Sequence, residues 1–152
     1  MEPAPSWDAV WVDHMLTSYR RSLGRELAAA HAGPDLAAWL YAQAPFCLLA
    51  HDGGHDPHFV YANQTAQRCF EYPWQELVGL PSRLSALPDG RAERARLLAD
   101  VARDGFAEGY RGLRVAKSGR RFWIEDVTVW NVLDAAGRFL GQAATYQRTS
   151  PA

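Results

Sequence analysis

The sequence has few cysteines, almost no net charge and no long hydrophobic run. Two cysteines, Cys47 and Cys69, occur in 152 residues, too few for the disulfide framework of a small secreted domain. The 16 basic and 17 acidic residues leave a net charge of −1, so the chain lacks the positive charge that drives non-specific binding to nucleic acids and anionic membranes. No apolar run reaches the roughly 18 residues that a membrane span needs, and the start Met-Glu-Pro-Ala-Pro is not typical of a signal peptide. These absences predict a cytoplasmic protein that binds neither nucleic acids nor membranes.

Hydrophobic residues, by contrast, are plentiful: they make up 48% of the chain, and aromatic residues 12%, enough for one domain with a buried core. Periodicity and turn residues predict helices and strands in separate blocks. The helices are expected at about residues 6–27, 35–43, 63–70, 73–78 and 89–103, and the strands at about 46–51, 58–62, 106–115, 121–133 and 138–147. Such blocks are typical of an α+β fold. We predict a five-stranded antiparallel sheet with helices on one face (residues 35–152), preceded by an N-terminal helix and a Gly33-Pro34 break (residues 1–34).

Three segments resemble PAS domains: Phe-Val-Tyr-Ala-Asn at 59–63, Tyr-Pro-Trp-Gln-Glu-Leu-Val-Gly at 72–79, and Lys-Ser-Gly-Arg-Arg-Phe-Trp-Ile-Glu at 117–125. More narrowly, the chain is similar to the MEKHLA family, a PAS-related domain whose bacterial members are small stand-alone proteins. The residues that carry this similarity are 44–46, His51, 56–57, 61–63, 80–84, Arg114, 118–122, 129–131 and 141–144. The resemblance implies a PAS-like sensory or small-ligand-binding domain that acts through protein–protein contacts, and it specifies no ligand.

A ligand pocket is predicted from the strand at 121–133. Neither its even nor its odd positions are cleanly apolar, so alternation alone does not say which side faces the core. The PAS pattern places the even positions inward. The predicted pocket residues are then Ser82, Arg83, Tyr110, Arg114, Ile124, Asp126, Thr128 and Trp130. A few polar groups among aromatic side chains are typical of small-molecule sites. The alternative is an interior ion pair between Arg114 and Asp126 or Glu125 that binds no ligand.

An enzyme is the alternative hypothesis. In a cup-shaped α+β domain, Asp126 or Glu125 would act as general base and Arg114 would hold an anionic substrate. Motifs such as Gly-x-Ser-x-Gly and His-Glu-x-x-His are absent from the sequence. We therefore favour a binding protein and predict no catalytic residue.

No cofactor is predicted. His51, Asp52, His55, Asp56 and His58 crowd one turn, but spacing alone carries little geometry for a metal, and a polar turn is the simpler interpretation. The resemblance to light-sensing LOV domains places Ser82 where those domains carry the cysteine that forms the flavin adduct. It also places Arg114 and Ile124 where they carry flavin-binding asparagines. The helix predicted at 89–103 contains no histidine for haem. Cys47 and Cys69 are expected to be small core residues.

The N-terminal helix has an unusually broad apolar stripe. Its members are Trp7, Trp11, Val12, Met15, Leu16, Tyr19 and Leu23. A stripe that faces one sheet covers little more than about 100° of a helix, and surplus apolar surface usually marks an interface. The stripe predicts a homodimer held by this helix. The alternative is that the helix folds back and buries both sides against its own domain.

Overall fold

An antiparallel sheet forms the centre of the protein. The structure, a computed structural model, describes residues 9–28 and 36–152. The strand order is β2-β1-β5-β4-β3, and a sixth strand, β6, also pairs with β4. The strands are β1 (Cys47–Asp52), β2 (Phe59–Ala62), β3 (Phe106–Val115), β4 (Arg121–Leu133), β5 (Phe139–Tyr146) and β6 (Arg148–Pro151). The predicted α+β fold with a PAS-like antiparallel sheet is confirmed.

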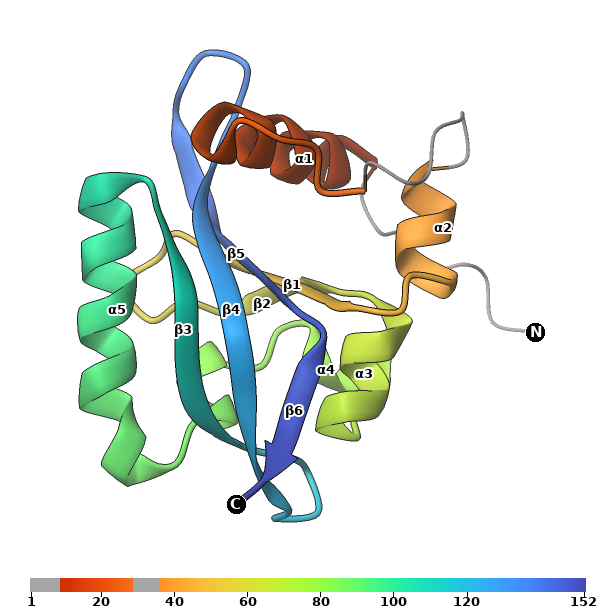
Figure 1. Ribbon diagram of the computed structural model, residues 1–152, viewed down its shortest axis with the longest axis vertical. Coiled ribbons are helices and arrows are strands. Elements are labelled where there is room, and N and C mark those ends of the chain that lie inside the picture. The colour runs from red at the N-terminus through yellow and green to blue at the C-terminus, as the bar shows by residue number, and fades with distance from the viewer. Residues whose placement is uncertain (1–8, 29–35) are drawn as a thin grey trace.

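Strand β6 is the one strand that the sequence did not predict. It follows β5 along the same side of β4 (Figure 1), pairing with residues from Phe122 to Glu125, whereas β5 pairs with residues from Thr128 to Leu133. Its sequence, Arg-Thr-Ser-Pro, has no apolar alternation from which a strand could be recognised. The pairing partner, rather than local propensity, makes this segment extended.

Helices cover both faces of the sheet. On one face lie α3 (Gln64–Phe70), α4 (Trp74–Leu77), the short 3-10 helices η1 (Ser82–Ser85) and η2 (Pro88–Gly90), and α5 (Arg91–Asp104). Side chains from this layer pack against Ile124, Val127 and Val129 of β4. Helices α1 (Ala9–Leu23) and α2 (Leu36–Ala42) belong to a second cluster with Trp130 and Val132. Because neighbours in a strand point to opposite faces, we call the Val129 side, next to α5, the inner face and the Trp130 side the outer face.

A bulge in β4 changes which of its residues face inward. Gly112 pairs with Ile124 and Tyr110 with Val127, so one extra residue is inserted in β4, and Asp126 there has a φ of 52°. Bulges of this kind turn the following side chains to the other face. Phe122 and Ile124 face inward before the bulge, whereas Val127 and Val129 do so after it. The prediction that all even positions face inward is therefore wrong beyond Ile124, and the bulge explains why neither set of positions is cleanly apolar.

Helix α1 lies across the outer face of its own sheet (Figure 1). Val12, Met15 and Tyr19 are 2%, 0% and 5% exposed, as the fold-back alternative expects. Val10 is 59% exposed on the far side of the helix, and Trp7 lies outside the described residues. In the part of the chain that the structure describes, no helix is long and apolar enough to cross a membrane.

Candidate functional site

A cavity of about 60 Å³ lies between the inner face of the sheet and helix α5. Most of its wall is apolar and includes Leu49, Phe59, Phe70, Leu98, Ile124 and Val127. Polar side chains reach it from α5 (Arg94), β3 (Tyr110 and Arg114), β1 (His51) and β5 (Gln142). Since a buried water needs about 10–15 Å³ by this measure, the cavity corresponds to about four to six such sites. We call it the inner cavity.

Two arginines line the inner cavity, one from α5 and one from β3. Arg94 of α5 is 9% exposed and Arg114 of β3 is 7% exposed. Across the described residues neither guanidinium forms an ion pair. Burial and, second, the positive charge of Arg114 lower the pKa of Arg94 to about 10, so Arg94 is still protonated at neutral pH. Buried charges are normally paired, and this pair of like charges is an exception.

Hydrogen bonds to uncharged acceptors hold both guanidinium groups in place. Arg94 Nη2 donates to Ser82 Oγ at 2.9 Å. Arg114 Nη1 donates to the carbonyl oxygen of Leu113 at 2.9 Å, and both of its terminal nitrogens lie 3.4 Å from the Tyr110 hydroxyl. The two side chains are thus positioned without being neutralised.

Glycine at position 112 allows Tyr110 and Arg114 to lie together on the inner face. The two residues flank Gly112 at alternate positions of β3, so all three share one side of the strand. A Cβ atom at Gly112 would lie 2.5 Å from the Tyr110 hydroxyl and 2.7 Å from Arg114 Nη1. Any larger residue would displace both side chains.

His51 is the third buried polar group of the wall. Its Nδ1 lies 2.8 Å from the carbonyl oxygen of Asp52, which requires a proton on Nδ1. Its buried Nε2 has no hydrogen-bond partner. Burial, the largest cause, and the positive charge of Arg94 lower the pKa of His51, against the opposing effect of Asp52. The ring is therefore neutral at pH 7, with an unsatisfied acceptor at Nε2.

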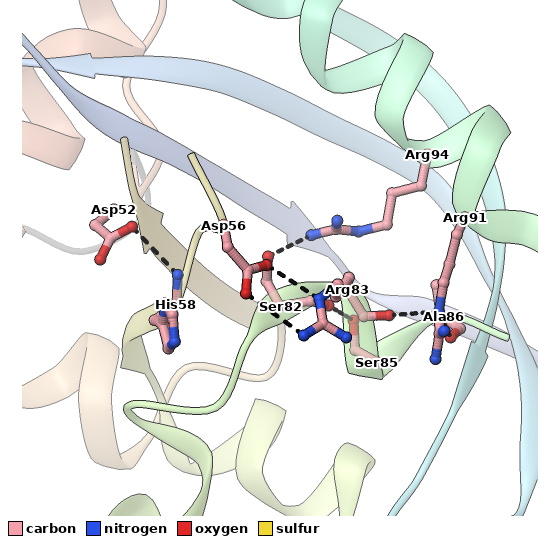
Figure 2. A network of polar contacts seen from close by, with 9 residues as sticks. All are labelled: Asp52, Asp56, His58, Ser82, Arg83, Ser85, Ala86, Arg91 and Arg94. Carbon is pink, nitrogen blue, oxygen red and sulfur yellow. Dashed lines mark hydrogen bonds and ion pairs between the residues drawn. The ribbon is translucent and has the colours of Figure 1, made fainter. Parts of the chain in front are cut away.

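A polar network ties η1 to its neighbours beside the cavity (Figure 2). Besides the Arg94 bond, Ser85 Oγ donates to the carbonyl oxygen of Ser82 at 2.7 Å. On the solvent side, Arg83 pairs with Asp56 of the β1–β2 turn at 3.1 Å. Arg91 Nε of α5 donates to the carbonyl oxygens of Arg83 and Ala86, each at 3.2 Å. The network fixes η1 between the β1–β2 turn and α5, and it fixes Arg94 with it.

The structure brings together half of the predicted pocket residues. Tyr110, Arg114 and Ile124 line the inner cavity, and Ser82 reaches it through Arg94. Arg83 instead points to Asp56 and solvent. The other three, Asp126, Thr128 and Trp130, do not line the inner cavity, because the bulge turns the end of β4 over. The prediction that these three residues line the same pocket is therefore wrong.

Arg94 is the charged residue of the cavity wall that sequence reasoning missed. It lies four residues before Leu98 and seven before Val101, so it shares the inward face of α5 with both. This spacing could have shown from the sequence that Arg94 faces inward. An arginine on an otherwise apolar helix face is easily interpreted as solvated, whereas here it is buried.

Asp126 and Thr128 line a different hollow, of about 290 Å³, with Glu125 and Arg148. Glu125 is already bound there, to Ser150 at 2.8 Å and to Arg111 at 2.7 Å. The hydrogen bond from Ser150, followed by that from Arg111, lowers the pKa of Glu125, the opposite of what a general base needs. Arg114 lines the inner cavity instead, so the described residues assemble neither the catalytic arrangement of the enzyme hypothesis nor the interior ion pair of the alternative interpretation.

The structure also shows the surroundings of the two cysteines and of the histidine-rich turn. Cys47 is buried and Cys69 half-buried, both as free thiols, and Cys69 Sγ lies 3.5 Å from the Tyr146 hydroxyl. In the turn, Asp56 pairs with Arg83, while His51 is buried and bonded to Asp52. Within residues 9–28 and 36–152, no group of three or more His, Cys, Asp or Glu side chains could hold a metal ion.

Solved structures share this fold at low sequence identity. A PAS domain from Colwellia psychrerythraea has a TM-score of 0.65 at 13% identity, over 78% of this chain and 95% of that one. An RNA-binding light-oxygen-voltage receptor has a TM-score of 0.62 at 23% identity, over 74% of this chain and 32% of that one. A light-oxygen-voltage domain studied with a flavin analogue has a TM-score of 0.57 at 18% identity, over 70% of this chain and 76% of that one. At these identities the similarity shows the fold.

We do not propose flavin as a ligand of this cavity. Ser82 is 0% exposed, and its hydroxyl accepts a hydrogen bond from Arg94. A hydroxyl in place of a thiol cannot supply the sulfur of a flavin adduct. The cavity of about 60 Å³ is far smaller than a tricyclic ring system requires, and two guanidinium groups occupy its walls.

The sequence itself gives the family. No curated protein matches the chain. The sequence pattern of the MEKHLA domain matches residues 9–151, so the match begins at helix α1, ahead of the boundary predicted near residue 34. A match over nearly the whole chain identifies the protein as a member of the MEKHLA domain family.

Proposed function

We propose that this protein is a sensory domain that binds a small molecule in its inner cavity and passes the signal on through protein contacts. One observation carries the proposal: Arg94 and Arg114 are both less than 10% exposed beside one cavity, and neither has an ion-pair partner among the described residues. PAS-like domains are typically sensory. A concave site with an apolar wall and a few fixed polar groups is the usual form of a small-molecule site.

A purely structural role for the two arginines has less support. A structural buried guanidinium normally has a carboxylate partner, because an uncompensated buried charge is costly. The described residues offer Arg94 the Ser82 hydroxyl and offer Arg114 the Tyr110 hydroxyl and a carbonyl oxygen. A bound ligand would supply the missing compensation.

Native mass spectrometry of the purified protein tests this proposal. We expect a small molecule to remain bound in part of the population, and we expect the preparation to be colourless, because no flavin or haem is proposed. Ala144 lines the cavity, so Ala144→Leu should fill it and abolish the bound mass. Ala99→Leu, on the exposed side of α5, is the matched control and should retain it. A bare mass in every preparation, together with no stabilisation by any compound of a metabolite library, would contradict ligand binding.

For the output we propose a homodimer that uses the far side of α1. The support is Val10, which is 59% exposed, next to the partly buried Trp11 on the same helix; two-fold pairing is the commonest way to cover such a surface. Light scattering at tens of micromolar should give twice the chain mass. Val10→Glu should give the monomer, whereas Ala92→Glu, on the exposed side of α5, should not. A monomeric wild type, or a dimer that survives Val10→Glu, would contradict this interface.

A further inference from the structure

We infer that the ligand of the inner cavity is a small organic carboxylate, bound between the guanidinium groups of Arg94 and Arg114. The inference rests on the proposed function, since it names the class of molecule that the same cavity takes. It follows from three properties of the site: the sign of its charge, the donors that its arginines leave unused and the size of its apolar part.

The sign of the charge requires an anion. Arg94 and Arg114 are 9% and 7% exposed, and in the described part of the chain no carboxylate lies within ion-pair distance of either. His51, the other titratable wall residue beside Arg94, is held neutral by burial. The residues that line the cavity include no Asp or Glu. A cationic or neutral ligand would leave both buried positive charges uncompensated.

The free donors suit a carboxylate. A guanidinium has five N–H donors in a planar fork that matches a carboxylate in bidentate geometry. Arg94 uses Nη2 for Ser82 Oγ, and its Nε and Nη1 make no hydrogen bond among the described residues. Arg114 uses Nη1 for the Leu113 carbonyl oxygen, and its other bonds are the two of 3.4 Å to Tyr110. Both arginines are thus fixed by neutral partners and still have donors left for an anion.

The rest of the wall limits the ligand to a short apolar tail. Leu49, Phe59, Leu97, Leu98, Val127 and Val129 surround the remaining space, and the volume of about 60 Å³ corresponds to about four to six water-sized sites. A phosphate carries oxygen on all sides, so part of it would face apolar side chains without a donor. A carboxylate places its charge at one end and hydrocarbon at the other, as the wall does.

Calorimetric and thermal-shift titrations of the intact protein test the inference. The probes are sodium acetate, propionate and pyruvate at constant ionic strength, with propionamide as the neutral analogue and inorganic phosphate as the second anion. We expect saturable binding and a rise in Tm with at least one carboxylate, and neither with propionamide. Arg94→Met and Arg114→Met should each weaken carboxylate binding by at least about tenfold, as loss of a charge-assisted bidentate contact does.

Two controls separate lost binding from lost folding. Arg111→Met changes an arginine of the same strand that is stacked on Trp123 and paired with Glu125 on the surface, and it should leave carboxylate affinity unchanged. Arg94→Met and Arg114→Met should unfold at no lower temperature than the wild type without ligand, because each removes an unpaired buried charge. Arg94→Lys keeps the charge without the fork and should retain part of the affinity.

The outcomes distinguish this inference from the proposed function. A neutral molecule found in the cavity by mass spectrometry, with no carboxylate binding at tens of millimolar, overturns the inference and leaves the sensory proposal standing. Phosphate binding that depends on both arginines, without carboxylate binding, also overturns the carboxylate assignment. If Arg94→Met, Arg114→Met and Arg111→Met all leave carboxylate binding unchanged, the ligand lies outside the inner cavity. That result overturns the site. If no ligand of any kind binds, both proposals fail.

Discussion

Replacing Asn63 with alanine should lower the free energy of unfolding by about 3–5 kcal/mol, because it leaves several buried backbone groups without partners at about 1–3 kcal/mol each. Asn63 is 0% exposed. Its Oδ1 accepts hydrogen bonds from the Leu48 and Ala66 amides, both at 3.1 Å. Its Nδ2 donates to the carbonyl oxygens of Leu40 at 3.0 Å and Phe46 at 2.9 Å. One side chain thus connects α2, β1 and α3.

Urea denaturation measures this loss as a shift of the midpoint. Gln64→Ala, at the adjacent and only half-buried position, is the matched control and should cost less than about 1 kcal/mol. Asn63→Asp retains both acceptor bonds but loses the two donors, so it should be nearly as damaging as alanine at neutral pH. A loss below about 1 kcal/mol for Asn63→Ala would mean that water satisfies the four backbone groups.

Asn63 also illustrates how far local sequence rules reach. An asparagine ahead of an apolar run predicts a helix N-cap, and the Ala66 amide bond confirms that Asn63 caps α3. The other three bonds join it to residues 15 to 23 positions earlier in the chain. Those bonds depend on how α2 and β1 pack against each other, which no local pattern specifies.

The β4 bulge marks the point where the predicted site fails. Up to Ile124 the PAS register assigns the inward side chains correctly, so Tyr110, Arg114 and Ile124 were predicted and do line the cavity. Past Asp126 the alternation is reversed. A positive φ at an aspartate is allowed but not dictated by the sequence. The position of the bulge is instead determined by how β4 pairs with β3. That pairing has a second irregularity near Gly109, which has a φ of 72°.

Trp130→Ala should destabilise the protein by about 3–5 kcal/mol, as large-to-small aromatic substitutions in cores do. Trp130 is 0% exposed beneath α1. Its Nε1 donates to the carbonyl oxygen of Met15 at 3.0 Å, and its ring meets that of Tyr19 edge to face with centroids 4.8 Å apart. The substitution removes the packing surface on which α1 rests, together with one of the bonds that hold it.

Trp123→Ala on the same strand should cost clearly less, about 1 kcal/mol, because Trp123 is only half-buried and its main partner is the guanidinium of Arg111, 3.9 Å above the ring. Trp130→Phe should fall between the two alanine variants, since it keeps an aromatic ring against Tyr19 but loses the bond to Met15. Thermal melts rank the three variants, and hydrogen exchange should show protection lost in residues 9–23 for Trp130→Ala but not for Trp123→Ala. A melt order in which Trp123→Ala is the more damaging change would contradict the assignment of Trp130 to the contact between α1 and the sheet.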